Sequence, residues 1–155
     1  MNRKLASWKP WITIAAVLML SAFVLAACSA APTTDIPKPS NSGGTGEAVN
    51  LTGDATAGAT VFSANCASCH GDQGKGGIPN PGSDDGVVPA LNPIDPGLKN
   101  ADPKIFATNI DPFLEHGSSP EGSNPALQMK PFGDQKLLTP QQIADTIAYV
   151  FSLNK

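Results

Sequence analysis

Basic residues, histidines and cysteines are few in this sequence, and their shortage excludes several classes of protein. The 155-residue chain has ten Lys and Arg against thirteen Asp and Glu, with two His and three Cys. Three of the basic residues and none of the acidic ones lie in the first 27 residues, so a chain starting at residue 28 has seven bases, thirteen acids and a net charge of −6. A nucleic-acid partner is excluded, because no basic surface is available to displace counterions from phosphates. A protein partner with a basic face is expected instead.

The first 27 residues have the layout of a bacterial lipoprotein signal peptide. Arg3, Lys4 and Lys9 precede an uncharged stretch from Trp11 to Ala27, which ends in small residues before Cys28. We predict cleavage after residue 27 and a lipid on Cys28, with a second acyl chain on the new amino terminus because stable anchoring takes two chains. The alternative is an uncleaved membrane helix with no role for Cys28, since the uncharged stretch approaches the ~20 residues of a spanning helix. Either way, the rest of the chain lies on the extracytoplasmic side of the cell membrane.

Residues 28–50 are rich in Pro, Thr, Ser, Gly and Asn and contain almost no large apolar side chain. Such a segment cannot bury enough apolar surface to fold, so we expect a flexible tether with a root-mean-square reach of about 25 Å. The folded domain is predicted at 51–155. A domain of that size often needs a covalent crosslink or a bound metal or cofactor in addition to its apolar core, and we call such a group a staple.

A staple is visible in the run Cys66-Ala67-Ser68-Cys69-His70. Two cysteines three positions apart, followed directly by His, can form thioethers with the two vinyl groups of a haem while the imidazole ligates the iron from the same turn. A zinc site would need two more Cys or His ligands, and the only others after residue 27 are Cys28 and His116. A thioredoxin-like pair needs a βαβ context, and a disulfide this short closes almost no loop. The motif therefore indicates one covalently bound haem c.

Helix signals stand on both sides of the motif. Asp54 is suited to cap a helix that runs up to Cys66, in which Gly58 and Phe62 share one face with that cysteine. Near the carboxyl end, Thr139-Pro140-Gln141-Gln142 has the pattern of a capping box with Pro at the first helical position, and Leu138 with Ile143 is placed as a hydrophobic staple. An apolar stripe follows, with Tyr149 alongside: Ile143, Ile147, Val150 and Phe151.

With these features, residues 51–155 resemble a class I cytochrome c domain. The resemblance implies an all-α fold of three main helices and long loops around one covalent haem. It also implies that Gly58 lets the first and last helices cross, that Phe62 packs beneath the crossing, and that Tyr149 meets the glycine there. The lipid-anchored arrangement further resembles the mono-haem cytochrome c subunit of alternative complex III.

The resemblance also extends to the residues around the haem. Val88-Pro89-Ala90-Leu91 is similar to the segment in which a proline carbonyl accepts the Nδ1 proton of the haem-ligating histidine, which assigns Pro89 to His70 and Leu91 to packing on the haem. A middle helix is expected from Asp102 and Pro103, with Phe106 and Ile110 on its haem side. Residues 76–86 form a longer surface loop than a minimal domain needs, serving as a docking contact or as a spacer.

Met129 is the remaining candidate for the sixth iron ligand, because Met1 and Met19 fall in the signal peptide. Its segment, Gln128 to Asp134, resembles the axial methionine loop of the family, although Lys130 separates Met129 from Pro131. A thioether favours ferrous iron, so His70/Met129 ligation implies a higher potential than ligation by two imidazoles. The alternatives are that Met129 fills the core and that His116 is the ligand.

These assignments predict an electron carrier rather than an enzyme, since no arrangement of catalytic acid, base or nucleophile is recognisable. The protein would act as a tethered shuttle or as a subunit of a respiratory or photosynthetic membrane complex, such as alternative complex III. The alternative is a haem-based ligand sensor or a peroxidase-like enzyme, which would need a labile sixth ligand.

Overall fold

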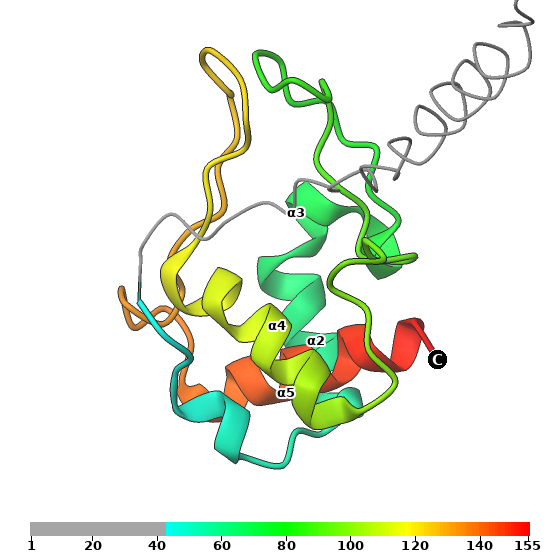
Figure 1. The fold of residues 1–155 in the computed structure, drawn as a ribbon, viewed down its shortest axis with the longest axis vertical. Coiled ribbons are helices and arrows are strands. Elements are labelled where there is room, and N and C mark those ends of the chain that lie inside the picture. Colours follow the sequence, from blue (N-terminus) through cyan, green and yellow to red (C-terminus); the bar gives the residue numbers. More distant parts are fainter. Residues whose placement is uncertain (1–42) are drawn as a thin grey trace, which may run out of the picture. The chain divides into compact units, whose positions relative to one another are not determined.

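Helices joined by long loops make up residues 43–155, the part of the chain that the computed structural model describes. This range has no strand, only two isolated β-bridges, which join Pro79 to Val87 and Ser118 to Met129. The predicted all-α architecture is confirmed (Figure 1). In chain order the elements are η1 (Glu47–Asn50), α2 (Ala55–Asn65), α3 (Ala67–His70), η2 (Asp72–Gly74), α4 (Pro103–His116) and α5 (Pro140–Leu153).

The three long helices start where the sequence predicts. The Asp54 carboxylate accepts hydrogen bonds from the backbone N–H groups of the first turn of α2, with Thr56 at 2.7 Å. Asp102 does the same for α4, accepting from Lys104 N–H at 2.8 Å, with Pro103 at the first helical position. Each cap satisfies donors that a helix end otherwise leaves unpaired, and contributes about 1 kcal/mol.

The start of α5 is a complete capping box. The Thr139 hydroxyl accepts from the Gln142 N–H at 3.2 Å, and the Gln142 side chain accepts from the Thr139 N–H at 2.9 Å. Leu138 and Ile143 flank the cap, and both are buried in the core. The reciprocal bonds and this apolar pair fix the direction in which the chain enters the helix.

Helices α2 and α5 cross in close contact (Figure 1). Gly58 is buried at the crossing, where a methyl group on its Cα would lie 3.0 Å from Tyr149 Cβ and closer still to the backbone of α5. One turn further along α2, the rings of Phe62 and Tyr149 pack with their centroids 5.3 Å apart. The predicted meeting of Gly58, Phe62 and Tyr149 is confirmed.

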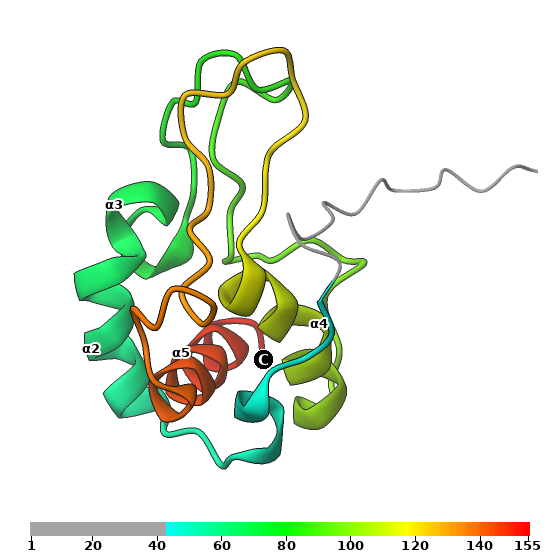
Figure 2. The same ribbon diagram turned by 90° about the vertical axis from the view of Figure 1, so that its left-hand side faces the viewer.

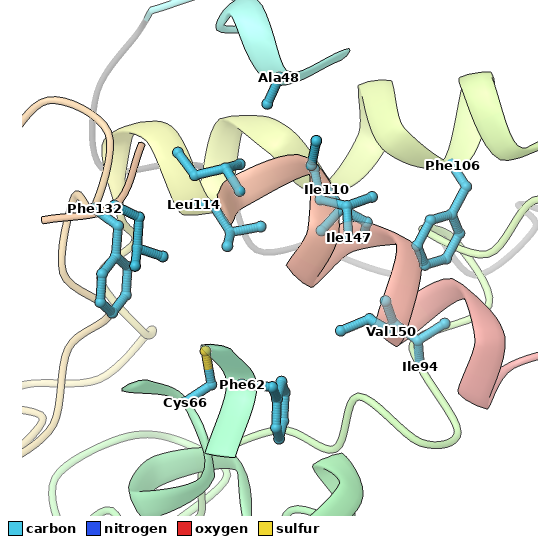
Figure 3. Close-up of a cluster of buried hydrophobic side chains, with 13 residues drawn as sticks. Ala48, Phe62, Cys66, Ile94, Phe106, Ile110, Leu114, Phe132, Ile147 and Val150 are labelled. Carbon is cyan, nitrogen blue, oxygen red and sulfur yellow. The ribbon is translucent and has the colours of Figure 1, made fainter. Parts of the chain in front are cut away.

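The third long helix, α4, packs against α5 and closes the core. Phe106 of α4 is completely buried and meets Phe151 of α5 edge-on, with ring centroids 5.2 Å apart. Figure 3 shows side chains of α4 and α5 on one side of this interior and those of α2 on the other. The buried apolar residues are Ala48, Phe62, Cys66, Ile94, Phe106, Ile110, Leu114, Phe132, Leu138, Ile143, Ala144, Ile147 and Val150.

The folded unit begins earlier than residue 51, the start expected from the sequence. Residues 47–50 form η1, and Ala48 is 2 % exposed within the core. The Gly46 N–H donates to the buried carboxylate of Asp111 at 2.5 Å, and the Lys104 ammonium donates to the carbonyl of Val49. Composition suggested a tether here, but contacts with α4 hold this short stretch on the domain. Residues 1–42, with the predicted signal peptide, Cys28 and most of the predicted tether, lie outside the described range.

Two loops, 76–88 and 118–129, extend side by side from the helices, and we call them the paired loops (Figures 1 and 2). Backbone hydrogen bonds join them near their tips, including Asp84 N–H to Glu121 O at 2.9 Å and Ala126 N–H to Pro81 O at 2.9 Å. The first loop is the long segment expected from the sequence. Its pairing with a second loop was not expected. Among residues 43–155, no helix has the length and apolarity that a membrane span requires.

Candidate functional site

The cysteine motif forms a single helical turn at the end of α2. Cys66 ends α2 and begins α3, and its carbonyl accepts hydrogen bonds from the N–H groups of Cys69 at 3.1 Å and His70 at 2.9 Å. These bonds hold both thiols and the imidazole on one turn of backbone. Cys66 is buried in the core and Cys69 is partly exposed.

No disulfide joins Cys66 to Cys69. Burial, with the neighbouring Cys69, raises the pKa of the Cys66 thiol to about 11, so this group is neutral at physiological pH. No group of three or more His, Cys, Asp or Glu side chains within residues 43–155 is arranged to hold a metal ion. The geometry offers two thiols for covalent attachment rather than a zinc cluster or a disulfide.

His70 is held in one orientation by the backbone of a distant loop. Its Nδ1 atom lies 3.1 Å from the carbonyl oxygen of Pro89, which is the contact that the sequence analysis expected between these residues. Burial lowers the pKa of His70, so the ring is neutral, and a neutral imidazole that donates through Nδ1 presents a lone pair at Nε2. A fixed ring with a basic nitrogen is what ligation of a metal centre requires.

The segment after Pro89 is positioned from two sides. The N–H groups of Leu91 and Asn92 donate to the carbonyl of Gly74 at 2.7 and 2.9 Å, which ties the segment to the turn that follows the motif. At the end of α5, the Asn154 side chain donates to the Leu91 carbonyl at 2.8 Å and accepts from Ile94 N–H at 2.9 Å. Leu91 is partly buried against the core. Asn154 was missed by sequence reasoning because a polar residue at a helix end usually signals no more than a cap.

Met129 lies at the base of the second paired loop. Its backbone pairs with Ser118 in both directions, at 3.0 and 3.2 Å, and its side chain is partly buried against the same core cluster that contains Cys66. Gly117 makes this approach possible, since a methyl group on its Cα would lie 2.4 Å from the Met129 carbonyl oxygen. Lys130 and Pro131 then lead to the buried Phe132, which lies across the core from Cys66 and Phe62 (Figure 3).

His116 has a different environment from His70. It ends α4, with Nδ1 3.0 Å from the Asp134 carboxylate and Nε2 2.8 Å from the carbonyl of Gly44. Because both partners are acceptors, the two bonds are complete only when both ring nitrogens carry a proton, so this site favours the imidazolium. The bond to Asp134 and that to Gly44 raise the pKa of His116 accordingly. A doubly protonated ring has no lone pair for a metal.

The comparison with protein families decides what this arrangement is. The family model for cytochrome c matches residues 55–154. The chain belongs to the cytochrome c family. The cytochrome is also 36 % identical over 102 residues to the cbb3-type cytochrome c oxidase subunit FixP of Sinorhizobium medicae (strain WSM419), and 35 % identical over 102 residues to FixP of Rhizobium meliloti (strain 1021).

These matches concern only part of each relative. The alignments cover 64 % of this cytochrome but 30 % of each FixP chain. No solved structure matches it. Family membership implies a covalently bound haem c and electron transfer, and together with the helices it confirms the class I cytochrome c fold.

The residues present suit a haem. Cys66 and Cys69 supply two thiols on the turn that also carries His70, and a donor bond through Nδ1 leaves Nε2 basic. The neighbouring interior is apolar, with Cys66, Leu91 and Met129 belonging to or packing on one hydrophobic cluster. Such a low-dielectric surrounding suits a porphyrin that must exchange electrons without rearrangement of its ligands.

Proposed function

We propose that this cytochrome is a membrane-anchored, extracytoplasmic electron carrier with one haem c, whose iron is ligated by His70 and Met129. When bound, the haem would supply one-electron redox chemistry. Cys66 and Cys69 would hold the haem covalently, and Pro89 would fix the ring of His70. Leu91 would pack on the haem and exclude water from it.

The contrast between the two histidines is the observation that carries the ligand assignment. His70 donates through Nδ1 to a backbone carbonyl, whereas both ring nitrogens of His116 are used in bonds to Asp134 and Gly44. Ligation of one haem by two imidazoles would require the imidazolium at 116 to lose a proton and break one of those bonds. Met129, which packs on the cluster containing Cys66, is the ligand that needs no such rearrangement.

Absorption spectroscopy with potentiometry on the full-length, membrane-extracted protein tests this assignment. A low-spin ferric spectrum with a weak near-infrared sulfur-to-iron band supports His/Met ligation and the electron carrier. A high-spin ferric iron would instead favour the ligand sensor or peroxidase-like enzyme, both of which need an exchangeable sixth position. Mass spectrometry of the same sample should show the polypeptide with the added mass of one haem.

The membrane partner is proposed from the relatives and from the predicted lipoprotein signal. FixP is named as a subunit of a cbb3-type cytochrome c oxidase, and alternative complex III is the other assembly that the lipid-anchored, mono-haem arrangement resembles. We propose that the chain passes electrons within, or to, a respiratory complex of this kind. Purification in mild detergent, followed by identification of stoichiometric subunits, separates an oxidase subunit, a quinol-oxidising complex and a free shuttle.

The anchor has its own test. Mass spectrometry of the amino-terminal peptide should find a lipidated Cys28 and no residues before it. When residues 1–27 are replaced by a cleavable signal peptide without a lipidation site and Cys28 by Ser, the protein should appear in the soluble extracytoplasmic fraction. A wild-type protein that retains residues 1–27 and an unmodified Cys28 would instead be held by an uncleaved helix.

A further inference from the structure

Asn80 is a buried polar residue that links the two paired loops. It is 1 % exposed, and its side chain makes two hydrogen bonds to one residue of the other loop. Its Nδ2 donates to the carbonyl of Leu127 at 3.0 Å, and its Oδ1 accepts from the N–H of Leu127 at 2.7 Å. The side-chain amide thus bonds both the N–H and the C=O of one residue, as a neighbouring β-strand would. Two such bonds fix the position of that residue more firmly than one.

The two ends of this link lie close in sequence to the two proposed iron ligands. Leu127 is two residues before Met129. On the other loop, Val88 N–H donates to the carbonyl of Ile78 at 2.8 Å, and the residue after Val88 is Pro89, whose carbonyl bonds to His70. A continuous set of contacts therefore runs from His70 through the base of the first loop to Asn80, and across to the loop that carries Met129.

Asn80 is itself held rigidly. Its N–H donates to the carbonyl of Gly86 at 2.8 Å, and its carbonyl accepts from both the N–H and the hydroxyl of Ser83, at 3.2 and 2.8 Å. The remaining bonds between the paired loops join backbone groups at largely exposed positions towards the tips. Asn80 is thus the buried contact between the loops that lies nearest to Met129 along the second loop.

From this geometry we propose that Asn80 is a positioning residue for the axial methionine: by bonding Leu127, it fixes the second loop so that the Met129 thioether stays on the iron. The role is needed because this loop has no regular secondary structure to hold it, apart from the short pairing of Met129 with Ser118. Loss of the amide would remove the partner of two partly buried backbone groups of Leu127, which disfavours this arrangement of the loop. The inference rests on the proposed ligation by Met129.

Competition by added imidazole tests it on the full-length holoprotein. Imidazole displaces a weakly held methionine from ferric haem, and its apparent affinity reports how strongly the protein favours the methionine-bound state. In Asn80→Ala we expect this affinity to rise roughly tenfold, with a weaker sulfur-to-iron band. Asn80→Asp keeps the acceptor for Leu127 N–H but loses the donor and buries a charge, so its imidazole affinity should also exceed that of wild type, and a wild-type affinity would count against the proposal.

Asn124→Ala is the matched control, because Asn124 is the same residue type in the second paired loop but is exposed. Its imidazole affinity should equal that of wild type. A purely structural role for Asn80 would lower the melting temperature and leave the imidazole affinity unchanged, and that result would overturn the proposal. So would an equal rise in both Ala variants, or a loss of folding in both Asn80 variants, which would assign Asn80 to global stability.

The failure of the proposed ligation can be told apart from the failure of this inference. If Met129→Ala retains the sulfur-to-iron band, the sixth ligand is another residue. The proposed ligation by Met129 is then refuted, and with it the role of Asn80. If Met129→Ala loses the band while Asn80→Ala behaves as wild type, the ligation stands and only the role of Asn80 is refuted.

Discussion

The backbone of α2 at Gly58 touches the backbone of α5 at Asp145: a methyl group on Gly58 would lie 1.9 Å from the Asp145 carbonyl oxygen. No carbon atom tolerates such an approach, so any larger residue must push the two helices apart. The Asp145 carboxylate also accepts a hydrogen bond from the Asp54 N–H at 2.8 Å, which joins the same helices at the start of α2. The crossing therefore depends on the absence of a side chain at one position.

We expect Gly58→Ala to destabilise the domain by on the order of 3 kcal/mol, because overpacking outweighs the roughly 1 kcal/mol that Ala gains over Gly in a helix. Chemical denaturation of the holoprotein measures this. Gly44→Ala is the control, since a methyl group there meets nothing within 4 Å, and its stability should lie within about 0.5 kcal/mol of wild type. Equal stabilities of the two variants would contradict the close crossing.

Removal of one motif thiol should leave the haem attached through a single thioether. We expect Cys66→Ser and Cys69→Ser each to retain one unsaturated vinyl group, which shifts the absorption bands of the pyridine complex of the haem. Cys66→Ser should also be the less stable variant, because Cys66 is 7 % exposed in the core and a hydroxyl there is buried in apolar surroundings. Ser68→Ala, in the same turn but exposed, is the control and should give the wild-type pyridine spectrum.

The helices and the cysteine motif could be predicted because their signals are local. Asp54, Asp102 and Thr139 each act on backbone groups within three residues, so the printed sequence already contains both partners of every cap. The contact of Gly58 with Tyr149 could be predicted only from the family resemblance. The apolar stripe of the last helix would be equally consistent with packing against any other part of a core.

What could not be predicted depends on contacts between distant residues. Asn80 and Leu127 are 47 positions apart, and neither has a sequence pattern that suggests the other. The same holds for residues 43–50, whose composition favours a tether. Their packing depends on Asp111 and Lys104, which lie on a helix 55 to 65 positions away from the groups that they bond.

Replacement of Met129 by Ala should abolish the sulfur-to-iron band and lower the reduction potential by on the order of 0.1 V or more, because loss of the soft thioether removes a ligand that favours ferrous iron. Lys130→Ala changes the next residue, which is exposed, and should keep both the band and the potential near wild type. The measurement is potentiometry followed by absorption. If instead His116→Gln lost its native spectrum while Met129→Ala kept it, the sixth ligand would be His116.

Stability should depend on pH through His116 in a defined direction. The hydrogen bond to Asp134, followed by that to Gly44, raises the pKa of His116 above its ordinary value of about 6.5. The folded state therefore binds the proton more tightly than the unfolded chain. The stabilisation is fully present below about pH 6.5 and is lost as the pH rises through the folded-state pKa.

We therefore expect the free energy of unfolding of wild type to exceed that of His116→Gln most at about pH 5 to 6, and the difference to shrink as the pH rises beyond about 6.5 through the folded-state pKa. Chemical denaturation across this range measures it, and His70 cancels from the comparison because both proteins contain it. The same comparison of His116 with His116→Gln, made in an Asp134→Asn background, should give a smaller difference. The substitution removes the carboxylate that favours the imidazolium. A difference that grew with rising pH would mean that the folded state favours the neutral ring, and the ring would then have a lone pair free to act as a ligand.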